Sequence, residues 1–350
     1  MLALRQALVR AADRVVPAEL ALYFQVIGFG RTRLLGTMVE LGIADALGEE
    51  ALTADELAGR LELHADSLHR FLRAAATADV VRLDRDGRFS LGRVGRALRA
   101  DHPAGLHHFV RYLNLRSTQA AWEPGAVAET LRTGQATFPL VHGRSIWAHY
   151  AEHPEEEQTF AASMRRVTEL DLPAIVHGYP WPQQGTVCDV AGGLGTVLAG
   201  VLAARPALRG ILVEAPGVLE EAEAHLAEKG VRARVDLVAG DMFDRIKADA
   251  DVYVLKDILH DWDDERCARI LATVRAAMRP GARVVLIEGL LERNEADPIV
   301  ALTDVQMLTQ TDGGRQRSVA ELQALLRDAR LEPGAVHRPA GPGLVEAVAR

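Results

Sequence analysis

The sequence predicts an α/β protein in which a mostly helical first half precedes a seven-stranded, mostly parallel sheet with helices on both faces. From about residue 181 onward, short apolar runs alternate with helical stretches, as in chains that build a parallel sheet. Before that point, apolar residues recur at the 3.6-residue spacing of helices. The last two runs, Ala335–His337 and Leu344–Ala349, have no crossover helix between them, so we expect the last strand to be antiparallel.

The N-terminal region has the outline of a winged helix, namely two helices followed by a hairpin. The predicted elements are the helix Glu56–Leu61 with the capping box Thr53–Glu56, a helix capped by Asp66 or Ser67, and the strands Val80–Leu83 and Arg88–Leu91. Such a module either binds DNA through its second helix, which offers His69, Arg70 and Arg73, or packs in a dimer. The net charge of −8 argues against DNA binding, so we expect no nucleic acid partner. Dimerisation is then the expected role of the module.

Composition excludes several classes of protein. The chain has 350 residues, of which 49% are hydrophobic and 25% charged, as in globular proteins that bury a core. Two cysteines, Cys188 and Cys267, exclude a disulfide scaffold and fit the reducing cytosol. The apolar run Leu20–Phe24 is too short to cross a bilayer, although Leu20–Phe29 suits an apolar interface between subunits. Because no secretory signal precedes it, we expect a cytoplasmic protein without membrane contact.

The second half predicts five strands before the closing pair, and three helices stand out between them. The strands are Thr186–Val190, Gly210–Glu214, Val235–Ala239, Val252–Leu255 and Arg283–Ile287, and the helices are Thr196–Ala204, Val218–Lys229 and Asp264–Met278. In such sheets, ligands bind beyond the carboxyl ends of the strands. We therefore expect the residues with chemical function to lie just after each strand.

The first two strands end in features that suit a nucleoside. A glycine-rich loop, 191–195, follows the first strand and lets the backbone approach a ligand closely. A dinucleotide fingerprint needs a third glycine where Leu198 stands, which argues against a nicotinamide cofactor. Glu214 ends the second strand, where a carboxylate can accept both ribose hydroxyls or can simply be solvated.

The third and fourth strands end in further candidates. After the third strand, Asp241 can accept from an exocyclic amine beside the apolar Met242 and Phe243, or can be a turn aspartate. After the fourth strand, His260 is the side chain best suited to accept a proton near neutrality. A purely structural role, capping the next helix and offsetting its dipole, is sufficient to explain the acids that follow it, Asp261, Asp263, Asp264 and Glu265. No second histidine or cysteine lies at metal-ligand spacing, so we expect no metal.

These motifs resemble the S-adenosylmethionine-dependent O-methyltransferases of the plant caffeic acid and bacterial polyketide and phenazine type. The matching segments are Asp189–Gly195, Val213–Pro216, Gly240–Phe243, Leu255–Trp262 and Gly313–Ser318. The helical first half resembles the winged-helix dimerisation domain of that family, so the resemblance covers essentially the whole chain. It implies a Rossmann-like methyltransferase sheet, S-adenosylmethionine as cofactor with S-adenosylhomocysteine as product, and a homodimer. The implied domains are a dimerisation domain at 1–100, a helical connector and substrate-pocket segment at 101–180, and a catalytic domain at 181–350.

The resemblance also assigns roles to single residues. His260 would be the general base, oriented by Glu288, with Gln316 at the position of a second acid. The residues implied at the cofactor are Ala191, Gly192 and Gly193 at its methionine part, Glu214 at the ribose, Gly240, Asp241 and Met242 at the adenine, Lys256 near the adenosyl end, and Thr168 in a closing segment. Candidate walls of the substrate pocket, although side chains of these types are more often plain core, are Phe109, Tyr112, Phe138, Trp147, Met164 and Met307.

Two residues depart from the family pattern. Ala191 stands where glycine is usual, and because an added methyl is tolerable where the backbone angle φ is negative, we expect it to change little. Gln316 stands where many members have a glutamate, and an amide cannot stabilise an imidazolium by charge. Base catalysis at His260 would then be weaker or depend on Glu288 alone.

The function expected is methylation of a hydroxyl on a small aromatic secondary metabolite, in the manner of antibiotic biosynthesis. A phenol ionises near pH 10, so a base within hydrogen-bonding distance assists its attack on the sulfonium methyl. Two alternatives remain open. The same fold and cofactor can carry out hydroxylation, decarboxylation or pericyclic chemistry, or the chain can be a ligand-binding winged-helix regulator.

Overall fold

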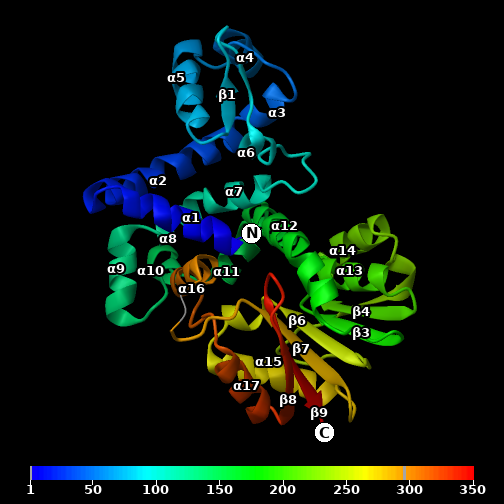
Figure 1. Cartoon of the computed structure of the whole chain (residues 1–350). Helices are drawn as coiled ribbons and strands as arrows, with labels where there is room; N and C mark the ends of the chain where they lie inside the picture. Colours follow the sequence, from blue (N-terminus) through cyan, green and yellow to red (C-terminus); the bar gives the residue numbers. More distant parts are fainter. Residues whose placement is uncertain (1, 295–296) are drawn as a thin grey trace. The chain divides into compact units, whose positions relative to one another are not determined.

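The computed structural model describes residues 2–294 and 297–350, and the chain forms two compact units (Figure 1). The first unit ends at Asn114 and the second begins at Leu115. No described helix is both long and apolar enough to cross a bilayer. Each unit has its own hydrophobic core.

The first unit contains the predicted pair of helices and hairpin. Its elements are α1 (Leu2–Val15), α2 (Ala18–Glu40), α3 (Ile43–Leu47), α4 (Ala54–Leu61), α5 (Ala65–Ala76), β1 (Val81–Leu83), β2 (Phe89–Leu91), α6 (Arg93–Arg96) and α7 (His107–Leu113). The capping box at Thr53 and Glu56 is confirmed. The predicted cap of α5 is wrong: His64 is the cap, and its Nδ1 accepts the amide of Ser67 at 3.3 Å.

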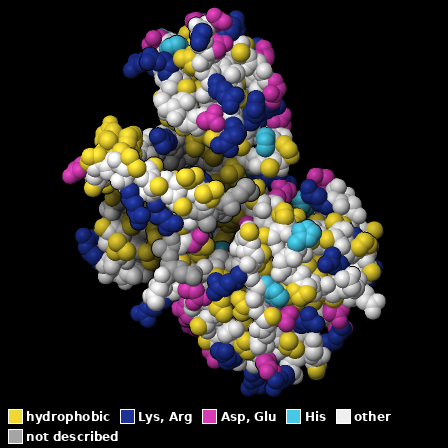
Figure 2. All heavy atoms as spheres, in the orientation of Figure 1, with side chains coloured by type: hydrophobic (Ala, Val, Ile, Leu, Met, Phe, Trp, Pro, Cys, Tyr) yellow, Lys and Arg dark blue, Asp and Glu magenta, His cyan; other side chains and the backbone are white. Residues whose placement is uncertain are grey.

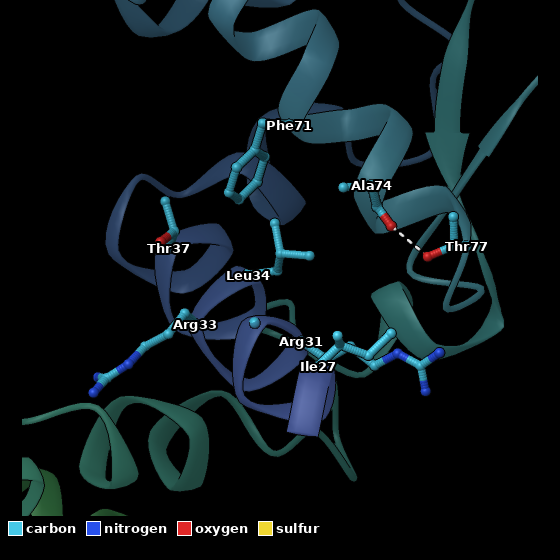
Figure 3. Close-up of a pocket in the computed structure, with 9 residues that line it drawn as sticks. Ile27, Arg31, Arg33, Leu34, Thr37, Phe71, Ala74 and Thr77 are labelled. Atoms are coloured by element: carbon cyan, nitrogen blue, oxygen red, sulfur yellow. Dashed lines mark hydrogen bonds between the residues drawn. The ribbon is translucent and has the colours of Figure 1, made fainter. Parts of the chain in front are cut away.

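The α2 helix leaves much of its apolar surface uncovered. Leu22, Val26 and Phe29 are all at least 61% exposed and follow one another at helical spacing. Figure 2 shows hydrophobic side chains gathered on the surface of this helix. A hollow of about 430 Å³ opens beside it, lined by Leu34 of α2 and Phe71 of α5 among others (Figure 3). This face has the character of an interface.

The second unit begins with helices and continues with the sheet. The helices are α8 (Arg116–Ala121), α9 (Pro124–Thr133), α10 (Thr137–His142), α11 (Ile146–Glu152) and α12 (Pro154–Gly178). The strands are β3 (Gly185–Val190), β4 (Leu208–Glu214), β5 (Val235–Ala239), β6 (Val252–Lys256), β7 (Arg283–Glu288), β8 (Leu331–His337) and β9 (Gly343–Ala349). Their order in the sheet is β5-β4-β3-β6-β7-β9-β8, and only β9 runs against its neighbours, as predicted.

Helices cover both faces of this sheet. One face packs against α12, α13 (Thr196–Ala204) and α14 (Pro216–Glu228), and the other against α15 (Asp264–Ala277) and α17 (Val319–Asp328) (Figure 1). A further helix, α16 (Pro298–Gln310), contacts α10. Most predicted strands are within two residues of those observed. The exception is β8, which begins four residues before the predicted start. The pairing of β8 is irregular after Pro333, and the sequence there resembles a turn.

Candidate active site

The candidate site lies at the carboxyl end of β3 and β6, where the order of the strands changes direction. The chain runs from β3 outward through β4 to β5 and then returns to the other side of β3 as β6. In open α/β sheets, ligands bind at such a switch point. The glycine-rich loop follows β3, and His260 lies in a short 3-10 turn, η2 (Leu259–Asp261), after β6.

Glu214 at the end of β4 is tied to the glycine-rich loop. Its carboxylate accepts the amide of Gly193 at 3.0 Å and the amide of Ala215 at 2.8 Å. Burial raises the pKa of Glu214. Gly193 has φ +56°, and a side chain there would enter open space. The half-buried Glu214 is therefore not simply a solvated charge, and the backbone beside it is accessible to a ligand.

The condition placed on Ala191 is not met. Its φ is +53°, in the left-handed region that glycine adopts without cost. The amide of Ala191 donates to the carbonyl of Val213 at 2.9 Å, which holds the residue in this conformation. The expectation that alanine is harmless here was wrong, because the methyl group strains the backbone by about 1–2 kcal/mol.

A buried carboxylate lies beneath the same loop. Asp189 is 1% exposed, and a side chain on Gly192 would collide with its carboxyl group. Burial raises the pKa of Asp189 to about 7, an effect that the amide of Leu198 only partly offsets. No described cation lies within ion-pair distance of Asp189. The loop thus has an acid beneath it that a positively charged ligand would favour.

The segment after β5 combines a turn with an apolar surface. Asp241 is exposed, and its Oδ1 accepts the amide of Phe243 at 2.8 Å, so it does act as a turn aspartate. Gly240 approaches Val213 so closely that a Cβ would lie 3.0 Å from it. Met242 is half-buried, and the ring of Phe243 meets Trp262 edge to face at 4.9 Å. This segment therefore contacts the turn that carries His260.

Lys256 at the end of β6 is enclosed by acids. Its side chain is 7% exposed and forms ion pairs with Asp257 and, at 3.6 Å, with Asp171 of α12. Burial would lower the pKa of Lys256, but the two carboxylates outweigh it and raise it. Lys256 thus links the carboxyl end of β6 to α12. This helix also carries Met164 and Thr168, both half-buried.

Three carboxylates surround His260, whose side chain is 13% exposed. Its Nδ1 lies 3.0 Å from Glu288 Oε2 and 3.8 Å from Asp257 Oδ1, and its Nε2 lies 3.6 Å from Asp261 Oδ1. Burial would lower the pKa of His260, but Glu288, Asp261 and Asp257 raise it to about 10. Burial also raises the pKa of Asp261 to about 7. The ring is therefore a strong base whose protonated form is stabilised from both sides.

Gln316 does reach the ring of His260. Its Nε2 lies 3.4 Å from Nδ1 of His260, and its buried Oε1 has no hydrogen-bond partner among the described residues. Turning the amide by 180° preserves its outline and presents Oε1 to the ring. Gln316 can therefore accept from a protonated Nδ1 without adding charge.

Sequence reasoning missed part of this constellation. Asp261 was interpreted as a helix cap, but Asp263 caps α15, and its Oδ1 accepts the amide of Arg266 at 2.7 Å. Asp257 has φ +53°, which turns its side chain towards Lys256 and His260. Asp257, His260 and Glu288 bring one ligand atom each within 4.8 Å of one another, so a metal ion could bind there. However, Lys256 and a protonated His260 already balance these acids.

The predicted pocket residues lie in different environments. Phe109 and Tyr112 belong to α7 of the first unit, and Tyr112 is fully buried. Phe138 is buried with Ile146 and Tyr150 in a small cluster of the second unit. Trp147 stacks on Trp262 with ring centres 5.8 Å apart, and Met307 in α16 is 6% exposed. Of these aromatic side chains, Trp147 contacts the segment next to His260.

Comparison with known proteins identifies relatives along nearly the whole chain. Residues 125–331 match the model of an O-methyltransferase domain, and residues 25–101 match that of an O-methyltransferase dimerisation domain. O-demethylpuromycin-O-methyltransferase from Streptomyces alboniger is 37% identical over 90% of this chain and 84% of that protein.

Solved structures agree with these matches. LaPhzM has a TM-score of 0.90 at 30% identity and covers 96% of this chain and all of that one. The O-methyltransferase NcsB1 from neocarzinostatin biosynthesis, solved with S-adenosylmethionine and 2-hydroxy-5-methyl naphthoic acid, has a TM-score of 0.77 at 31% identity, covering 91% and 96% of the two chains.

The strain at Ala191 predicts that glycine stabilises the protein. Replacing Ala191→Gly removes about 1–2 kcal/mol of strain and adds up to about 1 kcal/mol of chain entropy in the unfolded state. We expect the free energy of unfolding to rise by up to about 1 kcal/mol, measured by urea denaturation. In the control, Ala224→Gly at an exposed position in the interior of α14, it should fall by about 1 kcal/mol. A loss of stability in both variants would contradict the inferred backbone strain at Ala191.

The raised pKa of His260 predicts a pH-dependent stability. Its contribution is complete below the unfolded pKa near 6.5 and is lost as pH rises towards about 10. Replacing Glu288→Gln removes the largest cause of the increase. We expect the stability difference between wild type and this variant to shrink between pH 7 and 9, by up to about 1.4 kcal/mol per pH unit, measured by denaturation. The exposed Glu265→Gln should keep the wild-type slope, and a constant difference for Glu288→Gln would refute the assignment.

Proposed function

Because the chain belongs to the S-adenosylmethionine-dependent O-methyltransferases of secondary metabolism, we propose that it methylates a hydroxyl of a small aromatic acceptor with His260 as general base. The observation that carries this proposal is the ion pair between His260 and Glu288 at the switch point of the sheet. The acceptor class is supported by relatives whose names include a naphthoate and a phenazine O-methyltransferase.

The residues at the carboxyl ends of the strands fit the cofactor. When bound, S-adenosylmethionine supplies an electrophilic methyl group on a positively charged sulfur. The loop at Gly192 and Gly193, open at Gly193, would receive its methionine part, and the buried acid Asp189 beneath Gly192 favours the adjacent ammonium. Glu214 would hold the ribose, and the apolar Met242 with Asp241 would contact the adenine. Lys256 and Thr168 would close the site from β6 and α12.

His260 would remove the proton of the acceptor hydroxyl. Donation from Nδ1 to Glu288 leaves Nε2 as the atom that accepts this proton, and Asp261 beside Nε2 stabilises the resulting imidazolium. The raised pKa of His260, about 10, is close to that of a phenol, so transfer between them is nearly balanced in free energy. A cationic sulfonium nearby would lower the pKa of His260 and favour the neutral ring that a base requires.

Although Gln316 is neutral, Glu288 is not the sole acid beside His260. Asp257 and Asp261 also lie within 4 Å of the ring. A fourth carboxylate at position 316 would stabilise the imidazolium still further and make the ring harder to deprotonate. We infer that the neutral amide suits a base that already has three acidic neighbours.

The exposed face of α2 supports a homodimer. A second copy that packs on Leu22, Val26 and Phe29 would bury apolar surface that the first unit leaves exposed. In the second unit, we assign the substrate-pocket segment to the helices before the sheet, where Trp147 and Met164 lie.

The roles of His260 and Glu214 are separable by two variants. We expect His260→Asn to lower turnover by about 10²–10⁴-fold while calorimetry shows nearly unchanged binding of S-adenosylhomocysteine. Glu214→Ala should instead weaken that binding, because the ribose loses its acceptor. His177→Asn, at an exposed position of α12, serves as the matched control. Wild-type turnover by His260→Asn with a range of phenols would reject the base.

The dimer is tested on the exposed face of α2. Sedimentation of the wild type should give twice the chain mass of 38.0 kDa, whereas Val26→Glu combined with Phe29→Glu should give a single chain. Both side chains are exposed, so the fold of the monomer should survive. Leu83→Glu, on the exposed hairpin, should remain dimeric. A dimeric double variant would place the interface elsewhere.

A further inference from the structure

Arg317 is a buried arginine that the mechanism above does not use. Its side chain is 1% exposed, and its guanidinium points to the turn that carries His260. Nη1 donates to the carbonyl of Leu259 at 2.6 Å, and Nη2 donates to the carbonyl of Trp262 at 2.7 Å. These two carbonyls lie on either side of His260 and Asp261, so one planar group holds both ends of the turn.

The charge of Arg317 is balanced outside the catalytic cluster. Its Nε and Nη2 donate to Asp264 Oδ1 at 3.0 and 2.8 Å. Burial would raise the pKa of Asp264, but Arg317 and Arg315 outweigh it and hold the pKa below its usual range. Arg317 therefore does not depend on Glu288 or Asp257 for a counter-ion, and those acids remain available to His260.

A second donor meets the same two carbonyls. The thiol of Cys267 in α15 lies 3.2 Å from the carbonyl of Leu259 and 3.5 Å from that of Trp262. Burial raises the pKa of Cys267 to about 12, so it remains a thiol that can donate. Backbone carbonyls in a 3-10 turn lack the regular partners of a longer helix, and both donors satisfy them.

The backbone of Arg317 is fixed to the chain that follows β7. Its carbonyl accepts the amide of Leu291 at 3.2 Å, and the residue forms a parallel bridge with Leu290. Glu288 ends β7 only two residues earlier. A short path therefore runs from Glu288 through this bridge to Arg317 and from its guanidinium to the turn of His260. This path fixes the distance between the base and its acid.

From these contacts we propose that Arg317 is a positioning residue for methyl transfer, which holds the turn of His260 in register with Glu288. The inference rests on the proposed role of His260 as base. Because a displacement of about 1 Å can cost up to 10²-fold in rate, a loosened turn should slow the reaction without affecting the cofactor residues after β3 and β4.

The decisive variant is Arg317→Lys, which keeps the charge but cannot donate to both carbonyls at once. We expect kcat to fall at least tenfold, with S-adenosylhomocysteine affinity within twofold of wild type. We also expect the pKa of His260, measured by NMR titration of its ring, to fall by at least one unit because its contact with Glu288 loosens. The matched control is Arg315→Lys, since Arg315 pairs with the same Asp264 and with Glu321. It should stay within twofold of wild type in both measurements.

A second variant keeps the proposal falsifiable if Arg317→Lys does not fold. Cys267→Ala removes the other donor without changing charge, and we expect a two- to fivefold fall in kcat with a pKa shift of the same sign. Wild-type kcat and ring pKa in Arg317→Lys would overturn the proposal, as would wild-type values in Cys267→Ala if the first variant is unfolded. If His260→Asn is fully active, the base is rejected. The NMR titration then still decides whether Arg317 positions the turn.

Discussion

The pairing of β6 with β7 fixes the site, because it places Glu288 beside the turn of His260. The two strands are parallel, with Lys256 opposite Ile287, so the next residue of β7 emerges at the start of that turn. Glu288 is 2% exposed there, and its Oε1 accepts the amides of Ile258 at 3.2 Å and Leu259 at 2.9 Å. Its other oxygen pairs with His260. One carboxylate thus supports both the backbone and the ring, and a shift in register would remove both contacts.

The balance of charge follows from this arrangement. Glu288, Asp257 and Asp261 carry up to three negative charges in a region where burial penalises each one. Lys256 and a protonated His260 offset them, so the site accepts a proton readily and is favourable for a cation. A sulfonium cofactor meets that requirement when it binds. The cluster is thus better explained by the chemistry of the site than by stability, since buried ion pairs often contribute little to folding.

Local patterns in the sequence were sufficient for the architecture and for singling out His260, whereas its pairing with Glu288 was expected only from the family resemblance. Apolar runs and caps are properties of neighbouring residues, so most strands and the ends of α13, α14 and α15 could be predicted to within two residues. The conformation of Ala191 could not, because the sign of φ is set by the bond from its amide to Val213 on another strand. Arg317 was missed for a similar reason. Its partners Leu259 and Trp262 are more than fifty residues away, and only the folded chain brings them together.

His260 is held in place by contacts to its ring and by contacts to the backbone of its turn. Glu288 and Gln316 contact the ring and therefore affect its protonation, whereas Arg317 and Cys267 contact only carbonyls at the ends of the turn. A group that contacts the ring cannot change without altering its pKa directly. A group that contacts the backbone affects that pKa only through distance. A change at position 316 can therefore alter the basicity of His260 without moving its turn, so a neutral Gln316 is compatible with the position in which Arg317 and Cys267 hold His260.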